Sequence, residues 1–155
     1  MMFPTKYKIY FFVICFGCLL FNGCTKDEAL NTTGNPIPLI KLISVSSKQL
    51  KQFKDSLVIT FEYTDGDGDI GETNPDVNDL EIKDQRLSRA DYYFVKPLTP
   101  LDANIKVKGT ITVQMKNTFL LGTADSEITV FELRLRDRAG NWSNTIKTDV
   151  ITIIK

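Results

Sequence analysis

The segment Asp65-Gly66-Asp67-Gly68-Asp69-Ile70-Gly71-Glu72 has the residue types and spacing that best suit chemistry in this chain. Asp65, Asp67 and Asp69 alternate with glycines, which let the backbone curl so that the carboxylates converge. Three negative charges this close repel one another, and calcium, which takes about six to eight oxygen ligands, would relieve that repulsion. The sequence therefore predicts a calcium-binding loop. A solvated acidic turn is the alternative, because Asp-Gly is also a common turn pair.

The start of this segment resembles the Asp-x-Asp-x-Asp opening of an EF-hand loop, but its continuation departs from that pattern. Ile70 stands where the EF-hand glycine belongs, Gly71 comes one place late, and Asp76 replaces the terminal glutamate. Because the flanking sequence is strand-like, we reject a helical EF-hand and expect only the local calcium chemistry. The expected ligands are the side chains of Asp65, Asp67 and Asp69, the carbonyl of Gly71, and a late carboxylate from Asp76 or Asp79.

The composition narrows the classes of function. The chain contains no histidine, which removes the commonest general base and the commonest zinc ligand. Ser-His and Cys-His nucleophilic chemistry is thereby excluded, and sites for soft metals are disfavoured. The formal net charge of 0 offers no basic excess for nucleic acid. Nothing places two carboxylates across a cleft, so we expect no enzymatic activity, with a small carboxylate-based hydrolase as the less favoured alternative.

The elements that must position the acidic segment are predicted to be strands. A strand over 57–64 alternates in polarity and leads directly into the segment, with Leu57, Ile59, Phe61 and Tyr63 on one face. The other expected strands cover 39–45, 80–83, 91–96, 110–116, 128–136 and 146–154. These short strands, separated by turn signals, predict an all-β fold, an immunoglobulin- or fibronectin-III-like β-sandwich of about seven strands.

A second motif, Arg136-Asp137-Arg138-Ala139-Gly140-Asn141-Trp142-Ser143, predicts a tight turn between two strands. In such a sandwich the loop after the second strand and the last hairpin lie at the same end. We therefore expect Asp137 beside the acidic segment, where it either completes the shell of the cation or merely begins the turn. Arg134, Arg136 and Arg138 are expected on a solvated face, paired with neighbouring carboxylates.

The N-terminal sequence has the pattern of an exported, lipid-anchored protein. Lys6 and Lys8 precede an apolar run over 9–21, which is shorter than the about 20 residues that a membrane-spanning helix needs. Gly23 and Cys24 follow, and the arrangement resembles a bacterial lipoprotein signal peptide. That resemblance implies cleavage before Cys24 and a covalent lipid on its thiol. An ordinary secretory signal with a chance cysteine is the alternative.

The residues after the expected lipidated cysteine indicate the location of the protein in the cell. Thr25-Lys26-Asp27-Glu28 resembles the export signal of Bacteroidota lipoproteins, which implies a lipid anchor in the outer membrane and a protein that faces the outside. A polar linker facing the periplasm is the alternative. The expected division of the chain is a signal peptide over 1–23, the lipidated Cys24 with a flexible tether over 24–38, and a β-sandwich domain over 39–155.

Three motifs taken together resemble a family of small uncharacterised Bacteroidota lipoproteins. They are Tyr63-Thr64-Asp65-Gly66-Asp67-Gly68-Asp69-Ile70-Gly71, Pro97-Leu98-Thr99-Pro100 with Lys108-Gly109-Thr110-Ile111, and Asp137-Arg138-Ala139-Gly140-Asn141-Trp142-Ser143-Asn144. The resemblance spans about residues 40–154 and implies an exported β-sandwich without an established activity. We expect a surface-anchored, non-catalytic binding or structural module with a protein or glycan partner. A subunit of a larger outer-membrane complex for glycan uptake or adhesion is the alternative.

Overall fold

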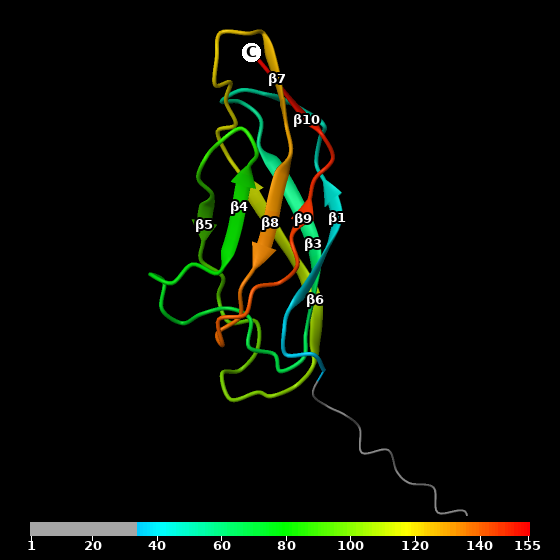
Figure 1. Ribbon diagram of the computed structural model, residues 1–155, viewed down its shortest axis with the longest axis vertical. Helices are drawn as coiled ribbons and strands as arrows, with labels where there is room; N and C mark the ends of the chain where they lie inside the picture. The colour runs from blue at the N-terminus through cyan, green and yellow to red at the C-terminus, as the bar shows by residue number, and fades with distance from the viewer. Residues whose placement is uncertain (1–33) are drawn as a thin grey trace, which may run out of the picture. The chain divides into compact units, whose positions relative to one another are not determined.

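The computed structural model describes residues 34–155, and every regular element in this range is a β-strand (Figure 1). The strands are β1 (Leu39–Val45), β2 (Gln49–Lys51), β3 (Leu57–Asp65), β4 (Leu80–Asp84), β5 (Asp91–Tyr93), β6 (Val107–Met115), β7 (Ser126–Thr129), β8 (Phe131–Leu135), β9 (Ile146–Lys147) and β10 (Ile151–Ile154). The predicted all-β class is confirmed. Within this range no helix is long and apolar enough to cross a membrane. The predicted signal peptide and Cys24 lie outside the described residues.

The strands form three small sheets with the orders β1-β3-β6, β5-β4-β8-β9 and β2-β10-β7. Pairing is antiparallel except between β2 and β10. β3 is the centre of the first sheet and pairs with β6 along its whole length, from Leu57 opposite Met115 to Asp65 opposite Val107. The sheet of β4 and β8 lies in front of the sheet of β3 and β6 in Figure 1. The acidic segment therefore begins at the end of a strand that is held on both sides.

One apolar core joins the three sheets. β3 contributes Leu57, Ile59, Phe61 and Tyr63, all at most 9 % exposed, as the alternation of the sequence predicted. The other sheets contribute Leu80 and Ile82 from β4, Phe131, Leu133 and Leu135 from β8, Leu50 from β2 and Ile151 from β10. Each large buried side chain contributes about 1.5–3 kcal/mol through the hydrophobic effect. This packing makes the end of β3 a rigid base for Asp65.

Two of the predicted strands are each divided between two sheets. The predicted strand 128–136 breaks at Val130, where β7 leaves to pair with β10 and β8 pairs with β4 and β9. The carbonyl of Val130 accepts a hydrogen bond from the Gln85 amide at 3.1 Å, one position beyond the Asp84–Phe131 pair, so Val130 still lies beside the end of β4. The predicted strand 146–154 breaks in the same way into β9 and β10. β2 was missed because three residues are too few to show an alternation.

β5 ends at Tyr93 rather than at Lys96, because the chain leaves β4 to meet the acidic segment. The carbonyl of Val95 accepts a hydrogen bond from the Glu72 amide at 2.9 Å. After Tyr93, the chain thus pairs with the acidic segment instead of continuing to pair with β4.

The described end of the predicted tether, residues 34–38, also contacts the acidic segment. The Gly34 amide donates to the carbonyl of Gly66 at 3.1 Å. A Cβ atom on Gly66 would lie 2.3 Å from the carbonyl oxygen of Asn35, so only glycine fits under this part of the chain.

Candidate metal centre

Three carboxylates meet at one end of the domain. Asp65, Asp69 and Asp137 each offer an oxygen, and these oxygens all lie within 4.8 Å of one another. Asp65 is the last residue of β3, whereas Asp137 follows β8 and forms an isolated antiparallel bridge with Ile70. The Arg138 amide also donates to the carbonyl of Asp69 at 3.1 Å. The structure therefore brings Asp137 beside the acidic segment, as the topological argument predicted.

Backbone amides fix the orientation of the two carboxylates in the segment. Asp65 accepts hydrogen bonds from the amides of Gly66 at 3.1 Å and Asp69 at 2.9 Å, which closes a tight turn. Asp69 in turn accepts one from the Ala139 amide at 3.0 Å through its Oδ2 atom. The acidic segment and the turn after β8 are thus joined by side chains as well as by the backbone.

Asp137 is held by its own turn and is almost completely buried. The backbone amide of Asn141 donates to Asp137 Oδ1 at 2.7 Å, and the side-chain amide donates to Oδ2 at 2.9 Å. Asp137 is 1 % exposed and Asp65 is 2 % exposed. Carboxylates with so little exposure require compensation for the water that they lose.

Two other carboxylate oxygens of the acidic segment lack such compensation in the described part of the chain. Among residues 34–155, Asp67 Oδ1 and Asp69 Oδ1 are buried and have no hydrogen-bond partner. A buried acceptor without a donor costs about 1–3 kcal/mol, and more when it carries charge. A bound cation would provide the missing contact. The geometry and the all-oxygen donor set therefore suit a hard divalent metal ion.

The pKa values of the clustered carboxyl groups also favour binding of a cation. The pKa of Asp65 is raised to about 6, mainly by burial and also by the neighbouring carboxylates of Asp67, Asp69 and Asp137, while the hydrogen bond from the Asp69 amide lowers it. Burial also raises the pKa of Asp69, with added repulsion from Asp137 and Asp67. Removing water and gathering like charges both disfavour the ionised forms. The cluster thus gains from binding a cation, whether a proton or a metal ion.

The other predicted ligands do not join the cluster of Asp65, Asp69 and Asp137. The carbonyl of Gly71 accepts a hydrogen bond from Arg138 Nη1 at 3.0 Å, so one of its lone pairs is occupied. Asp76 is exposed in the turn that follows. Asp79 is fully buried and pairs with Arg136 Nη2 at 3.3 Å. The group of carboxylates that approach one another in residues 34–155 includes neither Asp67 nor Asp76 nor Asp79.

The sequence predicted that the arginines at the end of β8 and in the following turn pair with carboxylates, but it did not identify their partners. Arg136 reaches Asp79 and Arg138 reaches Gly71, which lie 57 and 67 residues earlier in the chain. Arg134 makes two hydrogen bonds to Glu81, at 2.8 and 2.7 Å. These side chains tie β8 and its turn to distant segments, and no local pattern signals such contacts. The alternation of arginines along one face was the only available indication.

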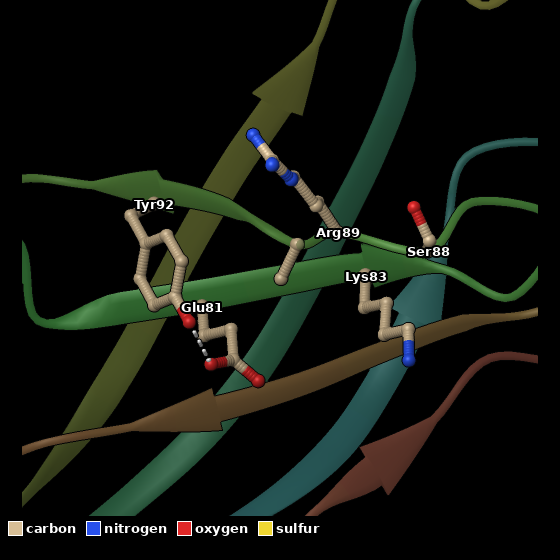
Figure 2. A pocket seen from close by; sticks show the side chains of 6 residues that line it. Glu81, Lys83, Ser88, Arg89 and Tyr92 are labelled. Atoms are coloured by element: carbon tan, nitrogen blue, oxygen red, sulfur yellow. Dashed lines mark hydrogen bonds between the residues drawn. The ribbon is translucent and has the colours of Figure 1, made fainter.

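A hollow of about 340 Å³ lies over β4 and β5, away from the carboxylate cluster (Figure 2). Tyr92 donates to Glu81 at 2.7 Å, and hydrogen bonds from Arg134 and Tyr92 lower the pKa of Glu81 despite partial burial. Figure 2 shows Lys83 and Arg89 pointing away from each other. Because the polar groups do not converge, this hollow is not a candidate site.

No protein-family model, no curated protein and no solved structure matches this chain. The resemblance to Bacteroidota lipoproteins therefore stays a prediction, and the site is interpreted from its own geometry.

Without metal, the protein is expected to be less stable at pH 7 than at pH 5 as far as Asp65 is concerned. Its pKa rises from 3.8 to about 6 on folding, so the folded state binds the proton more tightly. The stability that this proton provides is present below about pH 4 and is lost as the pH rises through 6. Melting temperatures with a chelator at pH 5 and pH 7 measure the effect. The melting temperature of Asp65→Asn should fall less than that of the wild type between pH 5 and pH 7. An equal fall in both proteins would contradict the raised pKa of Asp65.

Proposed function

We propose that this protein is a non-catalytic binding or structural module in which calcium orders the acidic segment. The observation that carries the proposal is the convergence of Asp65, Asp69 and Asp137, with ligand oxygens within 4.8 Å of one another. The buried Asp69 Oδ1, which has no hydrogen-bond partner in residues 34–155, supports it. A cation there would join the end of β3 to the turn after β8 and remove the repulsion between the carboxylates.

Calcium fits this donor set better than other common metal ions. All the available ligands are oxygens, and the chain contains no histidine. Zinc is therefore disfavoured. Magnesium demands near-octahedral geometry and keeps several waters, whereas calcium accepts irregular shells of carboxylates and carbonyls. Asp65, Asp69 and Asp137 would be the first ligands. Asp67 is a further candidate, because its Oδ1 atom is buried and has no hydrogen-bond partner in residues 34–155.

The proposal also includes the type of β-sandwich and the location of the protein in the cell. Sheets that share one core and are antiparallel except for the β2–β10 pair, with the acidic segment and the turn after β8 in contact, are consistent with an immunoglobulin- or fibronectin-III-like sandwich. A lipid on Cys24 would anchor this domain to the outer membrane, facing the outside, through a tether that ends where residues 34–38 meet the domain. The resemblance to Bacteroidota lipoproteins supports this placement.

Two other functions compete with this proposal. A subunit of a larger outer-membrane complex would also use a lipid anchor, and co-purification of the anchored protein with a stable partner would favour it. A small carboxylate-based hydrolase is less well supported, because Asp65 and Asp137 are 2 % and 1 % exposed and would not reach a polymeric substrate. Calcium-dependent hydrolysis of a glycan would nevertheless establish it.

Calcium is expected to raise the melting temperature of the metal-free protein by about 10 °C. Binding at about 100 times the dissociation constant stabilises the folded state by about 2.7 kcal/mol, and each kcal/mol shifts the midpoint of such a domain by about 3–5 °C. Thermal unfolding with calcium, with magnesium and with chelator measures the shift. Magnesium should produce a smaller one.

The matched variants are Asp69→Asn and Asp125→Asn. Both remove one charge, but Asp69 belongs to the carboxylate cluster, whereas Asp125 is 94 % exposed and pairs only with Lys155 within the described chain. Asp69→Asn should lose most of the calcium shift and Asp125→Asn should keep it. If calcium leaves the wild-type midpoint unchanged, the acidic segment is only a turn and the proposal fails.

A further inference from the structure

Residues 34–37, at the described end of the predicted tether, form a strap over the acidic segment. The Gly34 amide donates to the Gly66 carbonyl at 3.1 Å, and within the described chain this is the only hydrogen bond from the strap to another segment. A hollow of about 110 Å³ is lined by residues of the strap and of the acidic segment, including Asp65. The strap therefore lies beside one of the proposed metal ligands.

Gly66 connects the strap to the carboxylate cluster. Its amide donates to Asp65 Oδ1 at 3.1 Å, while its carbonyl accepts the hydrogen bond from the strap. The Asp69 amide donates to Asp65 Oδ2 at 2.9 Å, so both carboxylates and Gly66 belong to one turn. Because the carboxylates repel each other, this turn is strained until a cation is bound. A cation that relaxes the turn also fixes Gly66 in the position to which the strap docks.

The strap is held firmly at one end only. Pro38, which follows it, is buried, and the side chain of Asn144 bonds to both the amide and the carbonyl of Ile40 at 2.9 Å. Residues 35–37 are exposed. The single hydrogen bond at the other end favours the docked strap only about two- to tenfold. An allosteric coupling typically changes such an equilibrium by about 5- to 150-fold, so a bound cation can control it.

We infer that calcium in the carboxylate cluster controls the docking of this strap and thereby the direction in which the tether leaves the domain. The inference rests on the function proposed above and names what the metal regulates. With calcium bound, the strap is held at both ends, and Pro36 and Pro38 restrict the backbone between them. Without calcium, the chain hinges within residues 34–37. The predicted lipid anchor on Cys24 would then hold the domain in a fixed orientation only where calcium is present.

Hydrogen exchange of the Gly34 amide, followed by NMR, measures the docking, because in the described chain that amide bonds to the Gly66 carbonyl. At constant pH, saturating calcium should slow this exchange by about threefold or more relative to chelator. The Lys54 amide, which bonds to the Lys51 carbonyl at 3.2 Å in an exposed turn before β3, is the control and should not change.

The melting temperature, measured on the same samples, distinguishes a failure of this inference from a failure of the proposed function. If calcium raises the melting temperature but leaves exchange at Gly34 unchanged, the strap docks independently of the metal. The inference is then overturned, while the calcium-ordered segment stands. If calcium changes neither quantity, the proposed function fails and this inference fails with it.

Gly66→Ala tests the coupling from the other side, because its methyl group would displace the strap. The three atoms nearest to the added Cβ belong to residues 34–35, the closest being the Asn35 carbonyl oxygen at 2.3 Å. Gly66 is not among the glycines with positive φ, so alanine meets no backbone strain there. Exchange at Gly34 should be fast with or without calcium. Because linked equilibria are reciprocal, the calcium affinity should fall by the factor by which calcium slows that exchange in the wild type.

Gly122→Ala is the matched control for calorimetric titration with calcium. Its added Cβ would lie 3.4 Å from Glu127 Oε1, an ordinary contact, and Gly122 has no positive φ either. It should change neither the calcium affinity nor the exchange at Gly34. An unchanged calcium affinity in Gly66→Ala, together with fast exchange at Gly34, would show that docking and metal binding are independent and would overturn the inference.

Discussion

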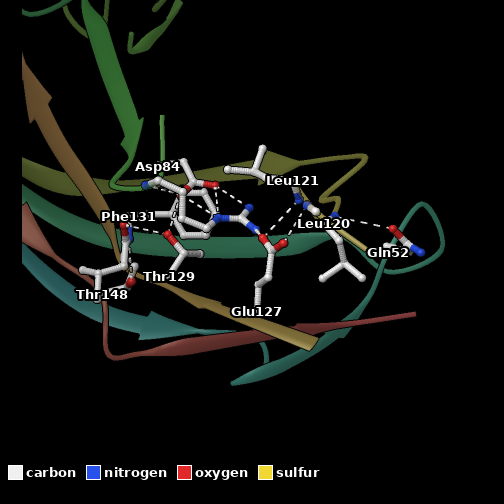
Figure 3. A network of polar contacts seen from close by, with 11 residues as sticks. Gln52, Asp84, Leu120, Leu121, Glu127, Thr129, Phe131 and Thr148 are labelled. Atoms are coloured by element: carbon white, nitrogen blue, oxygen red, sulfur yellow. Dashed lines mark hydrogen bonds and ion pairs between the residues drawn. The ribbon is translucent and has the colours of Figure 1, made fainter. Parts of the chain in front are cut away.

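Replacing Arg86 with methionine is expected to lower the free energy of unfolding by about 3–5 kcal/mol. The guanidinium bonds Asp84 through Nε and Nη2, at 3.1 and 2.7 Å, and Glu127 through Nη1 at 2.6 Å (Figure 3). The side chains of Arg86, Asp84 and Glu127 are only 13 %, 9 % and 20 % exposed. Methionine preserves much of the apolar stem but leaves the buried carboxylate of Asp84, and to a lesser extent the partly exposed one of Glu127, without their cation. That uncompensated charge accounts for the size of the loss.

Urea unfolding at pH 7 measures this change, with the m-value as a check that both proteins unfold in two states. Lys48→Met is the matched control, because the Lys48–Asp149 pair is 69 % and 65 % exposed and should contribute about 0–1 kcal/mol. Adding Asp84→Asn to Arg86→Met should restore part of the loss, since it removes one of the stranded charges. A loss below about 1 kcal/mol for Arg86→Met would show that the pairing contributes little.

The acid dependence of the same network has the opposite sign to that of Asp65. Burial raises the pKa of Asp84, but the hydrogen bonds from Arg86 and Thr129 outweigh it and leave the pKa below its usual value. Stability from Asp84 is therefore present above the unfolded pKa and is lost as the pH falls through the folded one. The loss from Asp84 begins only below its ordinary pKa of 3.8, so its contribution stays constant between pH 5 and pH 7 and does not mask the effect of Asp65 there.

The sequence predicted the centre of the fold better than its edges. The strand β3 alternates over its full length because both of its neighbours hold it in one sheet, so its buried face could be predicted directly. The strands 128–136 and 146–154 keep their polarity patterns while they change sheets near Val130 and residues 148–150. A residue pattern reports which face is buried, and it does not report which strand lies alongside.

In the candidate site as well, local features were predictable from the sequence and contacts between distant strands were not. Asp65 and Asp69 were predictable because their spacing is local, and Asp137 because the ends of neighbouring strands bring it close. Asp67 has the same local spacing but does not belong to the group of converging oxygens in the described residues. The Arg86 network and the contact of residues 34–35 with Gly66 were not predictable. They join segments far apart in the sequence, and their residue types are ordinary on a protein surface.

Gly71→Ala is expected to lower the free energy of unfolding by about 2–6 kcal/mol. Gly71 has a φ of 90°, which costs a residue with a side chain about 1–3 kcal/mol. In addition, an alanine Cβ would lie 2.2 Å from the Lys96 carbonyl oxygen and 2.9 Å from Pro97 Cα, and relieving such an overlap costs about 1–3 kcal/mol more.

Gly140→Ala separates these two contributions. Gly140 has nearly the same φ, 92°, but within the described chain nothing lies within 4 Å of the position its Cβ would take. Its loss should therefore be about 1–3 kcal/mol, the conformational part alone. The difference between the two variants in urea unfolding measures how tightly the segment after the carboxylates is clamped against residues 96–97. A clamped segment holds Asp65 and Asp69 in place before metal binds, so Gly71→Ala should also weaken calcium binding while Gly140→Ala leaves it nearly unchanged. Equal losses of stability in the two variants would mean that the segment yields freely, and that calcium would have to order it from a looser state.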